Sequence, residues 1–342
     1  MGNYFAIQWH ITDYCDQRCK HCYIYSDSDI DEVSMSLPNM ILVTNKIIEF
    51  CNRLGRTPYI YLTGGDPILH PHFWDLLEYF HKNKIRFCIM GNPFHLTLEN
   101  LKRMKELGCV KYQVSLDGLS EIHDYFRKKG SFDATIKAIK LIKQSGMWVA
   151  VMSTVSKMNY QDIPKLIDLV SDLGVDVYAV GRYSPTSIKK AHDENIHMTP
   201  LEYKSYMDEC YKKYNEHKND KITFHLKDHL WNLYLYEKGL YHIKDTANKI
   251  YDGCNIARNH ITILPNGSVY ACRRMDSMVG SIYLNSLYDI WTSKEMDEYR
   301  KYDEFVKCKK CELLRACRGC PSVTYGYTHN MYDSDPQCWK EV

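Results

Sequence analysis

The sequence of 342 residues has no hydrophobic run of membrane-spanning length and no segment with the features of a secretory signal. Its formal net charge is only +2, and its 44 basic and 42 acidic side chains are mixed along the chain. A basic groove for nucleic acid and a cationic stripe for a membrane surface are therefore both absent. These absences predict a soluble, cytoplasmic protein that binds neither nucleic acid nor membranes.

Cysteine, in contrast, is abundant and clustered. Of the fourteen cysteines, three lie between residues 15 and 22 and seven between residues 254 and 338. Grouped cysteines in a chain without a secretion signal indicate metal sites rather than disulfides. The remaining four lie in apolar patterns, where cysteine acts as a small core residue: Cys51, Cys88, Cys109 and Cys210.

The first group, Cys15, Cys19 and Cys22, has C-x3-C-x2-C spacing. It directly follows an alternating run, residues 5–12, that indicates a β-strand. Three thiolates on the loop after this strand can hold three irons of a [4Fe–4S] cluster and leave the fourth iron open. Zinc and ferredoxin-type sites usually take four protein ligands. The spacing alone also allows half a zinc site or three unrelated thiols.

Strand-like and helix-like patterns alternate beyond this loop. The predicted strands are residues 5–12, 59–63, 85–90, 110–116, 148–155 and 175–180. The predicted helices are residues 40–50, 73–81, 98–107, 132–146 and 163–173. Such alternation favours an α/β fold with a parallel sheet and helices outside it, in which ligands bind at the C-terminal ends of the strands.

Polar residues follow several of these strands. After the second strand come Gly64, Gly65 and Asp66. Paired glycines let the backbone approach a ligand and a carboxylate suits an ammonium group, although a simple Gly-Asp-Pro turn explains the pattern equally well. Other polar candidates at the same rim are Ser115 and Asp117 after the fourth strand, Arg127 in a His-Asp-x-x-Arg run, and Arg182 after the sixth strand.

The C-terminal cysteines form a second array: Cys254, Cys272, Cys308, Cys311, Cys317, Cys320 and Cys338. Residues 261–272 alternate on both sides of a Pro-Asn-Gly turn and indicate a β-hairpin. The array could bind one or two zinc ions. Two Fe–S clusters fit better, because the same chain begins with a three-cysteine site.

At these motifs the sequence resembles the radical S-adenosylmethionine (radical SAM) enzymes that carry a C-terminal SPASM domain. The three-cysteine loop is similar to the family signature, with His21 in the place of an aromatic residue. Residues 64–67 resemble the Gly-Gly-Glu motif, with Asp66 in place of the glutamate, and residues 115–118 match a Ser-Leu-Asp-Gly motif. The C-terminal array nearly reproduces the seven-cysteine SPASM pattern.

The resemblance implies a partial (β/α)6 TIM-like barrel with a small cysteine-rich α+β domain at its C-terminal end. The barrel would span residues 1–199, a helical bridge residues 200–250, and the SPASM domain residues 251–342. One departure concerns Cys317 and Cys320, which are separated by two residues where three are usual. This departure puts the role of Cys320 in doubt.

The resemblance also implies SAM and three [4Fe–4S] clusters as cofactors. The ligands of the SAM-binding cluster would be Cys15, Cys19 and Cys22, those of an inner auxiliary cluster Cys254, Cys272 and Cys320, and those of an outer one Cys308, Cys311, Cys317 and Cys338. The implied cofactor contacts are His21, Gly64, Gly65, Asp66, Ser115, Asp117, Arg127 and Arg182, although a rim arginine can equally close an ion pair. The inner set has three thiolates, so either His260 is the fourth ligand or one iron is open to substrate. A strand residue facing solvent is the alternative for His260.

The implied chemistry is reductive cleavage of SAM to methionine and a 5′-deoxyadenosyl radical that takes hydrogen from a substrate. A low-potential donor such as ferredoxin or flavodoxin is expected, and two further clusters suit a substrate radical that must lose an electron. SPASM relatives act mainly on peptides and proteins. We therefore expect thioether or carbon–carbon cross-linking, or a similar change, in a ribosomally synthesised peptide. Because the chain begins at the barrel, a separate leader-peptide-binding protein or leader-independent recognition is expected too.

Three alternatives stay open. Formylglycine formation, as in anaerobic sulfatase maturases, is disfavoured because Arg273 follows Cys272 where that group has an aspartate base. Radical tailoring of a small molecule such as a porphyrin conflicts with no residue. A zinc-binding module without radical chemistry is the non-enzyme alternative. Anaerobic purification separates these classes, because the enzyme would be brown with about 12 irons per chain and the module colourless.

Overall fold

The computed structural model describes residues 3–25, 32–218, 220–245 and 249–342. The chain divides into two compact units, and neither is continuous in sequence. Unit 1 contains Met1–Ser115, Asp124–Ala150 and Ile256–Arg300, and unit 2 contains Leu116–His123, Val151–Asn255 and Lys301–Val342. The division of the chain into a barrel, a bridge and a SPASM domain stays a prediction.

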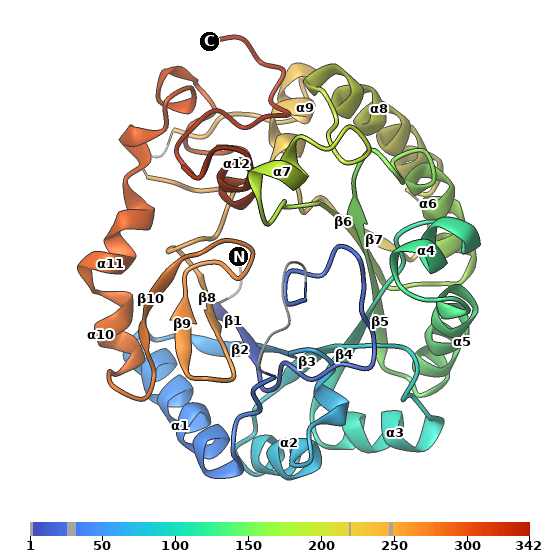
Figure 1. Ribbon diagram of the computed structural model, residues 1–342, viewed down its shortest axis with the longest axis vertical. Helices are drawn as coiled ribbons and strands as arrows, with labels where there is room; N and C mark the ends of the chain where they lie inside the picture. The colour runs from blue at the N-terminus through green and yellow to red at the C-terminus, as the bar shows by residue number, and fades with distance from the viewer. Residues whose placement is uncertain (1–2, 26–31, 219, 246–248) are drawn as a thin grey trace. The chain divides into compact units, whose positions relative to one another are not determined.

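Unit 1 contains a mixed sheet with the strand order β10-β9-β8-β1-β2-β3-β4. Its parallel strands from the first half of the chain are β1 (Tyr4–His10), β2 (Thr57–Thr63), β3 (Phe87–Met90) and β4 (Cys109–Ser115). The helices that connect them are α1 (Leu37–Arg53), α2 (Phe73–Lys82, after the short 3-10 helix η1, Pro67–Leu69) and α3 (Leu98–Glu106). Figure 1 shows these helices outside the strands. The predicted α/β class is confirmed.

Local sequence patterns explain these elements. Strand β1 alternates between buried and partly exposed positions, and Phe5, Ile7 and Trp9 are its buried face. Helix α1 begins with a proline in its first turn and buries positions spaced three and four residues apart, including Met40, Val43, Ile47 and Phe50. The apolar periodicity thus fixes which face of each element meets the core.

The C-terminal hairpin extends this sheet. Its strands are β8 (His260–Ile263), β9 (Ser268–Tyr270) and β10 (Met278–Ser281). Strands β8 and β9 are antiparallel, as the turn sequence predicts, and Gly267 in the turn has a φ of +84°. Strand β8 also pairs in parallel with β1, with Ile261 opposite Ile7. This pairing covers the edge of β1 that β2 does not cover.

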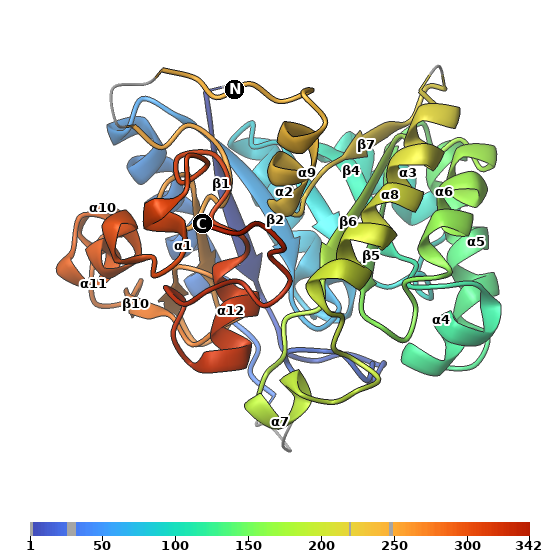
Figure 2. The same ribbon diagram turned by 90° about the horizontal axis from the view of Figure 1, so that it is seen from above.

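Helix α10 (Leu287–Trp291) packs beside α1 in unit 1, as the two views show (Figures 1 and 2). The contact is aromatic, because the ring centroids of Phe50 and Trp291 each lie 4.9 Å from that of Phe5. The other helical elements with residues in unit 1 are α4 (Ser120–Phe126, shared with unit 2), α5 (Ser131–Gln144), α11 (Lys294–Asp297) and η2 (Glu298–Arg300). Strand β5 (Trp148–Val155) also has residues in both units.

In unit 2, strand β6 (Val177–Arg182) pairs in parallel with β7 (Thr223–His225). Strand β7 lies within the predicted helical bridge, residues 200–250, so that segment is helical only in part. The helical elements of unit 2 are α6 (Ile163–Asp172), α7 (Ile188–Ala191), α8 (Pro200–Glu216), α9 (Leu230–Glu237), η3 (Tyr302–Glu304), η4 (Cys308–Lys310) and α12 (Pro321–Thr328). No helix in the described part of the chain has the length and apolar character that a membrane span requires.

We predict that Phe50→Ala lowers the free energy of unfolding by about 3–5 kcal/mol, because the side chain is 2% exposed and its loss leaves a cavity. Leu42→Ala on the same helix is the control, since Leu42 is 39% exposed and its loss should cost at most about 0.5 kcal/mol. Urea unfolding of the anaerobic protein measures both. Equal losses of unfolding free energy in Phe50→Ala and Leu42→Ala would contradict the packing described for α1.

Candidate active site

The loop that leaves β1 contains the three predicted ligands of the SAM-binding cluster. Cys15 is buried, and Cys19 and Cys22 are half-buried. The backbone N–H groups of Gln17 and Ile24 lie 3.4 Å from the sulfurs of Cys15 and Cys22. Burial raises the pKa of Cys15 to about 11, so a thiolate at this position needs a cation beside it. N–H groups aimed at sulfur fit an Fe–S cluster, whose potential depends on such contacts.

Two glycines position this loop. A Cβ on Gly64 would lie 2.2 Å from the carbonyl oxygen of Thr12, and one on Gly65 would lie 2.1 Å from that of Tyr14. The backbone N–H groups of Gly65 and Asp66 donate to the same two carbonyl oxygens at 2.8 and 2.9 Å. The sequence predicts that the glycines admit a ligand. The structure instead uses them to bring the cysteine loop onto the end of β2.

Asp66 has the features expected of a group that accepts hydrogen bonds from an amino group. It is fully buried, and its Oδ1 accepts from the backbone N–H of Asn92 at 3.3 Å. Its Oδ2 is buried without a hydrogen-bond partner among the described residues. Burial raises the pKa of Asp66 to about 7. An orphaned carboxylate oxygen next to the cysteine loop fits the amino group of SAM, which the resemblance assigns to it.

Asn92 is a site residue for which the sequence predicts only a backbone role, within Gly91-Asn92-Pro93, whereas the structure shows side-chain contacts. Its Nδ2 lies 3.3 Å from the Cys15 sulfur and donates to Asp16 Oδ1 at 3.1 Å. Tyr112 in turn donates its hydroxyl to the carbonyl oxygen of Asn92 at 3.2 Å. The signal in the sequence is its place directly after the third strand, at the rim where the other polar residues gather.

His21 and Arg127 also lie at the cysteine loop. The His21 ring packs edge-on against Phe126 with centroids 5.1 Å apart, and the backbone N–H of Lys20 donates to the Phe126 carbonyl at 2.9 Å. Nη1 of Arg127 lies 3.8 Å from the Cys19 sulfur. The structure therefore places both residues beside the predicted cluster, and their contact with SAM stays a prediction.

Asp117 and Ser115 belong to different units. Asp117 is fully buried in unit 2, where its Oδ1 accepts from the backbone N–H of Thr154 at 2.8 Å. Its own N–H donates to His123 Nδ1 at 3.0 Å. Ser115 is the half-buried last residue of β4 in unit 1. Asp117 thus stabilises the turn after β4, and the cofactor role of both residues stays a prediction.

Four C-terminal cysteines line one pocket of about 360 Å³ in unit 2: Cys308, Cys311, Cys317 and Cys338. They are the four predicted ligands of the outer cluster. Burial raises the pKa of Cys308 to about 12 and that of Cys317 still further, so these thiols also need a cation to ionise. Four sulfurs around one small pocket fit a cluster with complete protein ligation.

The predicted inner set is divided between the units. Cys254 and Cys320 belong to unit 2, whereas Cys272 belongs to unit 1. Cys320 precedes the first turn of α12 and does not line the outer pocket. His260 is the first residue of β8, with its Nε2 3.3 Å from Thr262 Oγ1. The inner ligand set and the role of His260 stay predictions.

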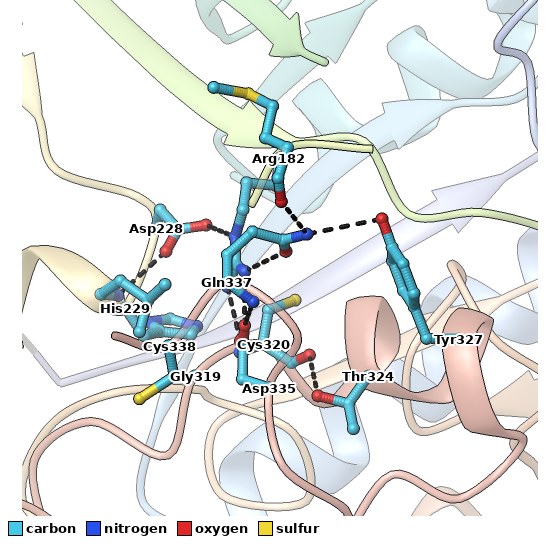
Figure 3. Close-up of polar contacts among 12 residues, drawn as sticks. Arg182, Asp228, His229, Gly319, Cys320, Thr324, Tyr327, Asp335, Gln337 and Cys338 are labelled. Atoms are coloured by element: carbon cyan, nitrogen blue, oxygen red, sulfur yellow. Dashed lines mark hydrogen bonds and ion pairs between the residues drawn. The ribbon is translucent and has the colours of Figure 1, made fainter. Parts of the chain in front are cut away.

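Arg182 lies in a buried ion-pair network rather than at an open rim (Figure 3). Its Nε donates to Asp228 Oδ2 at 2.6 Å, and its two terminal nitrogens donate to the two carboxylate oxygens of Asp335 at 2.7 Å. Nη1 also donates to Gln337 Oε1 at 2.7 Å. Because two carboxylates neutralise this guanidinium and all three nitrogens have protein partners, we no longer assign Arg182 to the cofactor.

The same network reaches the cysteine segments of unit 2. Asp335 Oδ2 accepts from the backbone N–H of Cys320 at 2.8 Å, and its carbonyl oxygen accepts from that of Cys338 at 3.0 Å. Gly319 has a φ of +59°, and a Cβ there would lie 2.2 Å from Asp335 Oδ2. Arg182, at the end of β6, therefore fixes the backbone of two segments that supply predicted cluster ligands.

A mixed α/β sheet with a three-cysteine loop after β1, together with a four-cysteine pocket near the C-terminus, is the arrangement expected of an iron–sulfur enzyme of the radical SAM class. Family models agree with this assignment. The model described as the radical SAM superfamily matches residues 9–170, and SPASM, described as an iron–sulfur cluster-binding domain, matches residues 254–321. Residues 9–170 thus belong to the radical SAM superfamily and residues 254–321 to the SPASM iron–sulfur domain, and SAM and iron–sulfur clusters are the cofactors of these two domains.

Proteins similar to this chain have names that indicate different products. The chain is 25% identical over 343 residues to an AdoMet-dependent heme synthase of Methanosarcina barkeri, covering 97% of this chain and 95% of that protein. It is 26% identical over 363 residues to the subtilosin biosynthesis protein AlbA of Bacillus subtilis, covering 98% and 72%. The solved structure of anSMEcpe with bound AdoMet and Cp18Cys peptide has a TM-score of 0.78 at 17% identity, covering 98% of this chain and 94% of that one. That likeness shows the fold.

We predict that SAM affinity depends on pH through Asp66. In the SAM-free protein the pKa of Asp66 is raised to about 7, and the N–H groups of a bound amino group donate to the ionised form and favour it. The contribution of Asp66 to SAM affinity should therefore be full above pH 7 and fall by up to about tenfold per pH unit below it. Asp66→Asn should bind SAM weakly and lack this component of the pH dependence. Anaerobic equilibrium dialysis without reductant measures both, and an equal pH dependence in the two proteins would exclude this role.

We predict that Arg182→Met lowers the free energy of unfolding by about 3–5 kcal/mol, because it leaves two buried carboxylates unpaired. Although burial would raise the pKa of Asp335, Arg182 holds it below its usual value. This pairing therefore stabilises the wild type above the unfolded pKa of Asp335, and the stabilisation is lost as pH falls through the lower folded pKa. In Arg182→Met, burial raises that pKa, so the variant should become more stable as pH falls from 7 to 5.

The control for this experiment is Lys309→Met, an exposed change in the same unit that should cost at most about 0.5 kcal/mol. Urea unfolding at pH 5 and pH 7 measures all three proteins. If Arg182→Met lost no more unfolding free energy than the control, the pairing of Arg182 with its two aspartates would be contradicted. An unfolding free energy of Arg182→Met that fell with falling pH, as in the wild type, would contradict it too.

Proposed function

We propose that this enzyme uses SAM to start the oxidative modification of a ribosomally synthesised peptide, through a thioether or carbon–carbon cross-link or a similar change. The observation that carries the proposal is the combination in one chain of a three-cysteine loop beside an orphaned carboxylate oxygen and a separate four-cysteine pocket. The first arrangement suits reductive SAM cleavage. The second suits a further cluster on the path by which an electron leaves the substrate radical.

The residues around the cysteine loop have separate roles in this proposal. Cys15, Cys19 and Cys22 hold the first cluster, and Asp66 orients SAM by its amino group. Asn92 fixes the Cys15 sulfur through its side-chain amide. Bound SAM and a reduced cluster supply a 5′-deoxyadenosyl radical.

The auxiliary cysteines complete the proposal with three clusters in total. The outer cluster is held by the four cysteines of the pocket, and the inner one by Cys254, Cys272 and Cys320, with His260 or a substrate group at its fourth iron. A ferredoxin or flavodoxin is the proposed electron donor, and a separate leader-binding protein is a proposed partner. The named products and ligands of AlbA and anSMEcpe support a peptide substrate.

A tetrapyrrole is the second candidate substrate. The observation that favours it is similarity to an AdoMet-dependent heme synthase along 97% of this chain and 95% of that protein. The two candidates share the SAM-cleaving step and differ in the product.

We predict that Cys15→Ala abolishes 5′-deoxyadenosine formation, whereas Cys272→Ala keeps SAM cleavage and loses product. The reason is that the first change removes a ligand of the SAM-binding cluster, and the second removes one from the inner cluster that takes the substrate electron. Chromatography of anaerobic, dithionite-reduced reactions measures 5′-deoxyadenosine. Mass spectrometry detects product from a precursor peptide encoded beside this gene or from iron coproporphyrin.

Cys51→Ala is the control, because Cys51 is a buried helix residue with no predicted ligand role and should keep both reactions. Normal product from Cys272→Ala would overturn the electron-accepting role of the inner cluster. If Cys15→Ala formed as much 5′-deoxyadenosine as the wild type, the proposed function itself would be overturned.

A further inference from the structure

Arg273, the residue directly after Cys272, carries a positive charge that no carboxylate in the described chain neutralises. Its Nε is buried and has no hydrogen-bond partner among the described residues. Its guanidinium carbon lies 4.9 Å from the centroid of the Tyr23 ring. No described carboxylate lies within ion-pair distance of it, in contrast to Arg182, which has two. A half-buried arginine with this environment is costly unless a ligand completes it.

A second unpartnered nitrogen lies beside this charge. His10, at the end of β1, is fully buried, and its Nδ1 has no partner among the described residues. Its Nε2 lies 3.1 Å from Gln8 Nε2, which also lies 3.3 Å from the Tyr23 hydroxyl. Burial, and then the charge of Arg273, lower the pKa of His10 well below its ordinary value. His10 is therefore neutral and adds a polar nitrogen without a second positive charge.

We propose that Arg273, flanked by His10 and Tyr23, binds a carboxylate of the substrate in the radical reaction. The planar guanidinium offers paired N–H donors that match a carboxylate. Tyr23 follows Cys22 and Arg273 follows Cys272, so the bound carboxylate would lie between two cysteine-bearing segments of unit 1. This inference rests on the proposed function and names the chemistry that its substrate must present. The carboxylate can come from a propionate side chain of a tetrapyrrole or from an acidic residue of a peptide.

The first test uses propionate and its neutral analogue propionamide as probes. Thermal unfolding of the anaerobic holoenzyme is followed with saturating SAM and no reductant, so that the carboxylate of SAM is already bound. Propionate at constant ionic strength should raise the Tm of the wild type by about 2 °C, and propionamide should not. Arg273→Met should lose this shift. Without probe its Tm should equal or exceed that of the wild type, because an unpaired charge has been removed.

Arg274→Met is the matched control, because it removes the neighbouring arginine and should keep the propionate shift. A lower Tm for Arg273→Met without probe, or an equal propionate shift in wild type and Arg273→Met, would overturn the proposal. A loss of SAM affinity in Arg273→Met by dialysis would also overturn it, because Arg273 would then bind SAM.

The second test identifies the source of the carboxylate. One probe pair is coproporphyrin III and its tetramethyl ester, and the other is acetyl-Gly-Glu-Gly-amide and its Gln counterpart. For one pair the acidic member should bind the wild type at least tenfold more tightly than it binds Arg273→Met, while the neutral member does not distinguish them. If neither acidic probe binds the wild type more tightly than it binds Arg273→Met, the proposal is overturned. Because no reductant is present, the result does not depend on SAM cleavage, so a failed Cys15→Ala experiment and a failed binding experiment are distinguishable.

Discussion

The contact between two backbones determines where the chemistry of this enzyme can take place. Gly64 and Gly65, at the end of β2, lie against the chain that leads from β1 into the cysteine loop, with no room for a side chain between them. The loop therefore has a fixed position relative to Asp66, the residue that follows the glycines. One short motif thus positions both the cysteines predicted to hold iron and the carboxylate proposed to bind SAM. Rigid elements under a site keep its geometry productive.

The second constraint is electrostatic and lies in unit 2. Arg182 and its two aspartates form a buried ion-paired cluster that fixes the backbone at Cys320 and Cys338. Arg273 is the contrasting case, an arginine of unit 1 whose Nε has no partner among the described residues. Buried charges in proteins are paired or serve a ligand. The difference between these arginines separates a residue that holds the protein together from one that recognises a substrate.

Much of the fold follows from local patterns. The parallel strands, their helices and the β8–β9 hairpin were predictable because apolar periodicity and a Pro-Asn-Gly turn act over a few residues. The pairing of β8 with β1 and the partners of Arg182 were not predictable. Asp335 lies 153 residues from Arg182, and no local pattern joins them. The four cysteines that line one pocket were predictable as a group from the family's cysteine pattern, whereas Asn92 acts through a side chain that only the fold brings to Cys15.

The central claim is that three thiolates leave one iron open and that SAM binds this iron through its amino and carboxylate groups. Electron–nuclear double resonance of the reduced enzyme with SAM labelled by ¹⁵N in the amino group and ¹⁷O in the carboxylate tests it most directly. We predict hyperfine coupling of both nuclei to the cluster of wild type, and its absence in Cys15→Ala. A reduced wild-type cluster that binds SAM without coupling to either nucleus would contradict the account.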